Sequence, residues 1–232
     1  MSEILPRDVL EFHEGDMPFS KQFGDHFYCK SDGRAECSHV FLNGNGLPER
    51  WQQANDFSIG ELGFGTGLNF LETWRQWKLH RKPGAQLQFT SFEAFPMEAA
   101  IMQRSLSTWP EIAVEYSELA AHWPSLTQSP VEWQMDEQTS LTIVVADVLD
   151  GMRAWNGQCD AWFLDGFAPS RNPDMWSLDL MQAMHERTRE KGTFASYTAA
   201  GWVRRNLAEA GFEVHKAPGF AGKRDMILGE KR

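Results

Sequence analysis

Residues 61–69 read Glu-Leu-Gly-Phe-Gly-Thr-Gly-Leu-Asn, with glycines at three alternate positions. The apolar run 57–62 predicts a short buried strand before this turn, and the pattern of 68–79 predicts a helix after it. Glycine has no Cβ, so the backbone can turn sharply here and pass close to a ligand. A strand, a glycine-rich turn and a helix in this order place a ligand at the carboxyl end of the strand.

The rest of the chain alternates in the same way. Further strands are predicted at 87–93, 141–146, 161–164 and 193–197, and further helices at 97–109, 178–189 and 200–210. The run 131–135 is expected to pair with 141–146 through a turn. Residues 212–216 and 225–228 predict an antiparallel hairpin, because the loop between them is too short for a parallel crossover. The pattern predicts an α/β fold: a doubly wound, mostly parallel sheet with a terminal antiparallel hairpin.

The first 53 residues differ from the remainder. Turn signals at 31–33 and 43–46 and a short extended run at 39–42 predict an irregular N-terminal extension, residues 1–53, packed on a core domain of residues 54–232. The N-terminus lacks the basic start and apolar run of a secretory signal, and no stretch approaches the ~18 apolar residues of a membrane helix. We therefore expect a cytoplasmic monomer with no membrane partner.

Cysteine and histidine usage limits the chemistry. The 3 cysteines have no C-x-x-C spacing, which argues against a disulfide framework and a structural zinc site. The 7 histidines show no ligand spacing either, so no metal is expected. Few cysteines in this arrangement are typical of a reducing compartment.

The glycine spacing indicates which ligand the turn holds. It reads G-x-G-x-G after the acidic Glu61, not the G-x-G-x-x-G of dinucleotide sites. This form resembles motif I of Rossmann-like methyltransferases that use S-adenosylmethionine, whose sulfonium and ammonium favour nearby carboxylates. The resemblance makes Glu61, Gly63, Gly65, Gly67 and Asn69 candidate cofactor-binding residues. The alternative is a tight turn without a ligand.

Two acidic residues at later strand ends extend this candidate site. Glu93 can accept the ribose hydroxyls, as strand-end acids do in Rossmann sites generally, so it does not discriminate between cofactors. Asp147 corresponds to the position that bonds the adenine amine in the resembling methyltransferases. Both have plainer interpretations: Glu93 as a solvated strand end and Asp147 as a turn former.

The segment 165–176, Asp-Gly-Phe-Ala-Pro-Ser-Arg-Asn-Pro-Asp-Met-Trp, follows the predicted strand 161–164. In amino-directed methyltransferases the equivalent loop lines the methyl-acceptor pocket. Asp165 can orient an amine and help remove its proton, or it can hold the ammonium of the donor, and the sequence leaves both roles open. A proline-stiffened loop without a ligand is the alternative. The candidate acceptor-binding residues are Phe167, Pro169, Arg171, Trp176 and Tyr197.

Taken together, these motifs carry a more specific resemblance. ELGFGTGLNFL (61–71), FEAFP (92–96), WFLDGFAPSRNPDMW (162–176) and the C-terminal run 193–229 resemble the methyltransferase half of the MnmC family of bifunctional tRNA wobble-uridine enzymes. The resemblance also covers Tyr28, which it makes a cofactor-binding residue. It implies methyl transfer from S-adenosylmethionine to the aminomethyl nitrogen of uridine 34 in the tRNA anticodon loop. It further implies an FAD-dependent oxidase, as a fused domain or a separate chain, as partner.

A net charge of -10 is unusual for a protein that acts on a polyanion. We therefore expect a local footprint made by Arg171, residues 187–191, Arg204-Arg205 and Lys223-Arg224, with salt-sensitive tRNA binding. A splayed wobble base is expected to stack on aromatic rings. The candidates for stacking are Trp176, Tyr197, Phe167 and Phe220. Solvated helix faces and core packing are the alternatives.

Other functions remain open at this point. An NAD-dependent oxidoreductase is disfavoured by the glycine spacing and by the lack of a hydride-site His or Lys. A methyltransferase acting on a small-molecule amine and a noncatalytic adaptor are further alternatives.

Overall fold

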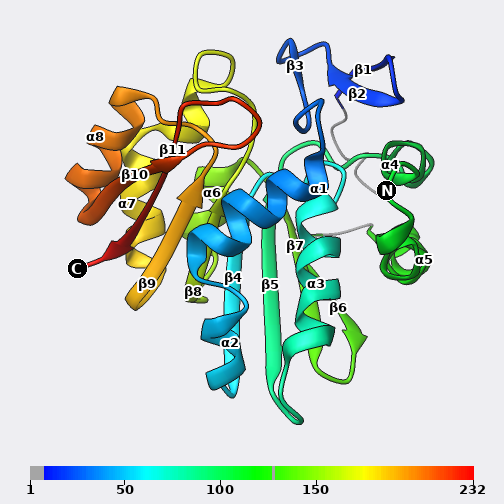
Figure 1. Cartoon of the computed structure of the whole chain (residues 1–232), viewed down its shortest axis with the longest axis horizontal. Coiled ribbons are helices and arrows are strands. Elements are labelled where there is room, and N and C mark those ends of the chain that lie inside the picture. The colour runs from blue at the N-terminus through cyan, green and yellow to red at the C-terminus, as the bar shows by residue number, and fades with distance from the viewer. Residues whose placement is uncertain (1–7, 127–128) are drawn as a thin grey trace.

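An eight-stranded sheet organises the residues that the computed structural model describes, 8–126 and 129–232 (Figure 1). Its strands lie in the order β10-β11-β9-β8-β4-β5-β7-β6. Their bounds are β4 (Asp56–Leu62), β5 (Gln86–Glu93), β6 (Val131–Asp136), β7 (Thr139–Val145), β8 (Cys159–Leu164), β9 (Thr188–Ser196), β10 (Phe212–Pro218) and β11 (Asp225–Lys231).

The pairing confirms the predicted doubly wound sheet. β4 pairs in parallel with both β5 and β8, β5 with β7, and β8 with β9, whereas β6, β11 and β10 each join through antiparallel pairs. The chain fills one side of β4 before it crosses to the other. The carboxyl ends of β4 and β8 therefore flank the point where the strand order reverses, which is where open α/β sheets bind ligands.

Helices cover both faces of the sheet. Their bounds are α1 (Gly33–Glu36), η1 (Cys37–Leu42), η2 (Asn43–Asn45), α2 (Glu49–Gln53), α3 (Leu68–His80), α4 (Ala99–Leu106), η3 (Pro110–Ile112), α5 (Ala113–His122), η4 (Trp123–Ser125), α6 (Val148–Ala154), η5 (Pro173–Trp176), α7 (Leu178–Glu186) and α8 (Gly201–Ala210). Successive residues of a strand serve opposite layers. On β8, for example, Phe163 belongs to the core cluster formed with the helices from η1 to α5, and Trp162 belongs to the cluster formed with α6, α7 and α8.

The N-terminal region contains a second, smaller sheet. β1 (Leu10–His13), β2 (Met17–Ser20) and β3 (Asp25–His26) pair antiparallel and stand above the carboxyl ends of the main strands (Figure 1). The extended run expected at 39–42 is wrong, because these residues are helical in η1. Cys37, Val40 and Phe41 follow helical spacing and bury one face in the core. The division of the chain at residue 53 stays a prediction.

Most predicted elements are present, with shifted ends. The expected helices 97–109 and 178–189 are shorter, as α4 and α7, and β9 already begins at Thr188. Helix α5 lies in a part of the chain where the sequence pattern predicts no clear element. Within the described residues, no helix has the length and apolar character to cross a bilayer, and no group of three or more His, Cys, Asp or Glu side chains could hold a metal ion.

Candidate active site

A cavity of about 1620 Å³ lies at the carboxyl ends of the central strands, beneath the small N-terminal sheet. The predicted site residues on its wall are Tyr28, Gly63, Gly65, Asn69, Glu93, Asp147, Asp165, Phe167 and Tyr197. Five other predicted residues, Glu61, Gly67, Pro169, Arg171 and Trp176, do not line it. The structure thus brings together residues from both sides of β4.

The glycine turn forms the floor of the cavity. Gly63, Gly65 and Gly67 all have positive φ angles, of 85°, 53° and 79°. A Cβ on Gly65 would lie 3.1 Å from the ring of Phe27, which is tighter than ordinary contact. Any larger residue there would strain the backbone and crowd the ring above it.

The amide groups of this turn already have partners within the protein. The N–H of Gly65 donates to Glu93 Oε2 at 2.8 Å, and those of Gly63 and Gly67 donate to backbone carbonyls at 2.9 and 2.8 Å. A dinucleotide turn instead offers its amides to a pyrophosphate. Here the Gly65 N–H is taken up by the Glu93 carboxylate, which argues against the NAD alternative.

Glu93 and Asp147 place carboxylates along the same wall. Glu93 Oε1 accepts a second backbone bond, from Phe95 at 2.7 Å, and burial raises the pKa of Glu93. Asp147 caps α6 by accepting from the N–H of Leu149 at 3.0 Å, and it also lines the cavity. The Asp147 side chain can therefore both cap the helix and bind the adenine amine. Each carboxylate keeps acceptor capacity for hydroxyl or amine donors.

Glu61 lies beneath the turn. Its side chain is fully buried, and its Oε2 accepts a hydrogen bond from the Ser91 hydroxyl at 2.7 Å. Burial raises the pKa of Glu61 well above its ordinary value. Glu61 does not line the described cavity, and its contact with the cofactor stays a prediction.

Asp165 follows β8 and faces the cavity beside the glycine turn. Its Oδ1 accepts from the N–H of Gly166 at 2.8 Å, and its Oδ2 accepts from Asn69 Nδ2 at 2.7 Å. Burial raises the pKa of Asp165 to about 7, although these two hydrogen bonds oppose the shift. Near neutral pH this carboxyl group can therefore take up and release a proton.

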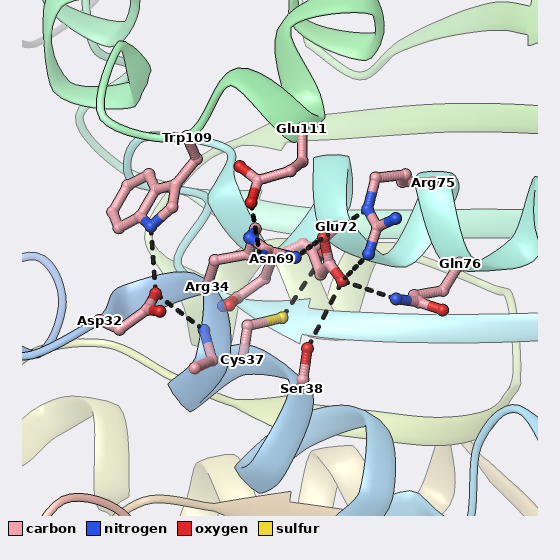
Figure 2. A network of polar contacts seen from close by, with 11 residues as sticks. Asp32, Arg34, Cys37, Ser38, Asn69, Glu72, Arg75, Gln76, Trp109 and Glu111 are labelled. Atoms are coloured by element: carbon pink, nitrogen blue, oxygen red, sulfur yellow. Dashed lines mark hydrogen bonds and ion pairs between the residues drawn. The ribbon is translucent and has the colours of Figure 1, made fainter.

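A buried polar network fixes the helix that carries Asn69 (Figure 2). Glu72 of α3 has no exposed side-chain surface, and it accepts hydrogen bonds from Arg75 and Gln76, each at 2.8 Å. Arg34 of α1 lies 3.5 Å away. Burial alone would raise the pKa of Glu72, but these donors lower it. The network joins α1 to α3, and no motif in the sequence predicts it.

Residues of the small N-terminal sheet and its loops form the roof of the cavity. Phe23 stacks on Phe167 with ring centroids 4.6 Å apart, and Phe27 contacts the edge of the same ring at 5.0 Å. Asp25 Oδ2 accepts the N–H of Ala168 at 2.9 Å. Sequence reasoning missed these roof residues because no local motif marks them.

Part of the predicted acceptor loop serves the core instead. Trp176 is fully buried, and its indole N–H donates to the carbonyl of Phe167 at 3.1 Å. Its predicted stacking with a base is corrected accordingly, since the ring has no exposed surface. Pro169 is also buried, while Arg171 is exposed near Gly24.

The predicted basic footprint divides between the two ends of the sheet. Residues 187–191 lie at the start of β9, the end opposite to the cavity, and Arg189 pairs with Asp160 at 2.7 Å. That cluster cannot join a rim around the cavity, which corrects the prediction. Lys223 lines the cavity. Arg204 and Arg205 lie near the start of α8, a few residues after Tyr197.

Comparisons with known proteins identify the family of this chain. A family model described as S-adenosyl-L-methionine-dependent methyltransferase matches residues 110–232. The "tRNA 5-methylaminomethyl-2-thiouridine biosynthesis bifunctional protein MnmC" of Methylobacillus flagellatus is 44% identical over 95% of this chain and 34% of that protein. The protein of the same name from Aliivibrio fischeri is 40% identical over 98% of this chain and 36% of its own length. The chain spans about a third of the length of these relatives.

A solved structure shows the same fold. MNMC2 from Aquifex aeolicus superposes with a TM-score of 0.75 at 22% identity, covering 98% of this chain and 72% of that one. The carboxylates on the cavity wall fit a cationic donor that carries hydroxyl groups. The family model covers more than half of the sequence. The chain belongs to the family of S-adenosyl-L-methionine-dependent methyltransferases.

Proposed function

We propose that this protein transfers the methyl group of S-adenosylmethionine to the aminomethyl nitrogen of 5-aminomethyl-(2-thio)uridine at tRNA position 34. The observation that carries the proposal is Asp165, a cavity-wall carboxyl whose pKa is raised to about 7 by burial. The name shared by the relatives at 40–44% identity supports the choice of substrate.

The donor would be held by cavity-wall residues near the carboxyl ends of β4, β5 and β7, together with Tyr28 from the N-terminal region. The residues near the strand ends are Gly63, Gly65, Asn69, Glu93 and Asp147. Tyr28 is itself fixed, because its hydroxyl donates to the carbonyl of Ser105 at 2.9 Å. When bound, the donor supplies an electrophilic methyl group, so the protein needs no further activating group.

Asp165 prepares the acceptor. An aliphatic amine is mostly protonated at neutral pH, and it must lose a proton before its lone pair can attack. The carboxylate of Asp165 accepts a hydrogen bond from the amine, orients it and takes up that proton. Asn69 and the Gly166 amide hold the carboxylate in place. The stacked rings of Phe23 and Phe167 give this end of the cavity an apolar roof.

The tRNA would approach the mouth of the cavity. Phe167 and Tyr197 offer rings to the splayed base, and the Tyr197 hydroxyl donates to the carbonyl of Gly166 at 2.9 Å. Arg171, Arg204-Arg205 and Arg224 would contact phosphates. An oxidase, as a fused domain or a separate chain, would act on the tRNA before this protein does. The methyltransferase would work in the cytoplasm, where tRNA is found.

Mass spectrometry of nucleosides tests this proposal. The chain is incubated with S-adenosylmethionine and tRNA that carries 5-aminomethyluridine, then the tRNA is digested. A gain of one methyl group on the wobble nucleoside, absent with Asp165→Asn, is expected. Methylation of free amines but not of tRNA would favour the small-molecule alternative. No transfer to either acceptor would contradict the proposal.

A further inference from the structure

An ion pair on the cavity wall has no part in the chemistry proposed above. Lys223, in the loop between β10 and β11, places its Nζ 2.7 Å from Oε1 of Glu36, at the end of α1. Glu36 is the more buried partner, with 10% of its side chain exposed against 42% for Lys223. Glu36 Oε2 also accepts the N–H of Cys29 at 3.0 Å, so its carboxylate is fixed.

The charges of the wall are strongly unequal. Its carboxylates are those of Asp8, Asp25, Glu36, Glu93, Asp147, Asp165 and Asp174. Among the described lining residues, the lysines are Lys30 and Lys223. This wall attracts a sulfonium and an ammonium, but it repels the carboxylate that S-adenosylmethionine also carries. A cation must therefore compensate that carboxylate.

The position of the pair fits this task. Cys37, the residue after Glu36, directs its Sγ toward the carbonyl of Asn69 at 4.0 Å, in the first turn of the helix that follows the glycine turn. The charge of Glu36 raises the pKa of Asp165 and that of Lys223 lowers it, so both lie within electrostatic reach of Asp165. Glu93 and Asp147, the candidates for ribose and adenine, follow strands on the other side of β4.

We propose that Lys223 and Glu36 bind the amino-acid end of the donor, Lys223 its carboxylate and Glu36 its ammonium. The two side chains compensate each other when the site is empty. The oppositely charged groups of the ligand replace that contact, so the buried Glu36 keeps a counterion in both states. This division leaves Asp165 for the acceptor amine. The inference depends on the methyl donor and not on tRNA.

Calorimetric binding of three ligands to the whole chain tests it. S-adenosylmethionine carries a sulfonium, an ammonium and a carboxylate. Its decarboxylated analogue keeps the sulfonium and the ammonium but lacks the carboxylate, and methylthioadenosine lacks all three charged groups. Lys223→Met is expected to weaken S-adenosylmethionine at least tenfold, about 1.4 kcal/mol, and to leave the other two ligands within about twofold. Glu36→Gln should weaken the two ammonium-bearing ligands and spare methylthioadenosine.

Two further variants serve as controls. Lys223→Arg keeps the cation and should retain most of the affinity for S-adenosylmethionine. Lys30→Met removes the other lining lysine and should change none of the three affinities. Unchanged binding of S-adenosylmethionine to Lys223→Met overturns the proposal, and so does an equal loss for all three ligands. Because the assay contains no tRNA, its outcome is independent of whether the proposed acceptor is correct.

Discussion

The two sides of the cavity are built in different ways. The donor wall, Gly63, Gly65, Glu93 and Asp147, comes from three short segments at the carboxyl ends of parallel strands, and hydrogen bonds to backbone N–H groups hold it. The acceptor wall, Asp165, Phe167 and Tyr197 with Phe23 above them, joins segments up to 174 residues apart, since Phe23 and Tyr197 share one cavity. This wall of the donor site is thus encoded locally, whereas the acceptor wall depends on the complete fold.

The largest expected effect is a loss of kcat without a loss of donor affinity, which distinguishes the acceptor wall from the donor wall. Asp165→Asn should lower kcat by about 10²–10⁴, the usual contribution of a general base, while the Kd of S-adenosylmethionine changes less than about threefold, because its charged groups have other partners. Single-turnover methylation and calorimetry measure the two quantities. Asp179→Asn, which changes an exposed carboxylate in the first turn of α7 that does not line the cavity, is the matched control. A parallel loss of donor affinity would instead assign Asp165 to the donor ammonium.

A substitution on the donor wall should have the opposite effect, because it should weaken donor binding and spare kcat. Glu93→Gln removes a charged acceptor of hydrogen bonds, each worth about 1.5–3 kcal/mol, so the Kd of S-adenosylmethionine should rise roughly 10–100-fold. At saturating donor, kcat should stay within about threefold, since the acceptor wall is intact. A fall in kcat that excess donor does not restore would show that the two walls are coupled.

The same difference explains which parts of the site the sequence predicts. The glycine turn, Glu93 and Asp147 each lie at the carboxyl end of a strand with a clear apolar pattern. The hydrophobic periodicity of the strands and the turn-forming residues after them therefore predict where these residues lie. The sheet, its parallel core and the terminal hairpin follow from the same signals. Trp176 has the right residue type in the right loop, but burial depends on α7 and α8 packing around it, which no local pattern reports.

The roof is the clearest case of information that the sequence does not display. Phe23 and Asp25 belong to no motif, and their partners, Phe167 and Ala168, lie more than 140 residues later. The Glu72 network is similar, because Arg34 reaches α3 only after η1 has packed on it. Such contacts are products of tertiary packing, and they shape the end of the cavity that receives the acceptor.

The pH dependence should also differ between the walls. At saturating donor, kcat is expected to rise about tenfold per pH unit below 7 and to level off above it, because the carboxylate form of Asp165 is the base. The sign for stability is opposite. A folded-state pKa near 7 against an ordinary 3.8 means that the folded protein holds the extra proton, so this group's contribution to the free energy of unfolding falls as pH rises through that window.

Denaturant unfolding at pH 5 and pH 8 measures the second effect. The wild type should lose more stability than Asp165→Asn between these two values, because the amide carries no charge to bury. Equal losses in the two proteins, together with a flat rate profile, would mean that Asp165 is already ionised at pH 5.

The smallest expected effect concerns the mouth of the acceptor wall. Arg171→Ala should weaken tRNA binding a few-fold and reduce the slope of log Kd against log salt by about 0.7–0.9, the value for one phosphate contact. Arg187→Ala removes the same charge at the opposite end of the sheet, where β9 begins, and should change neither quantity. Each of the two variants removes one positive charge, so a comparison between them separates the effect of the arginine's position from the effect of net charge. Equal effects would indicate that tRNA senses only the overall charge, whereas an effect of Arg171 alone places the anticodon loop against the acceptor wall.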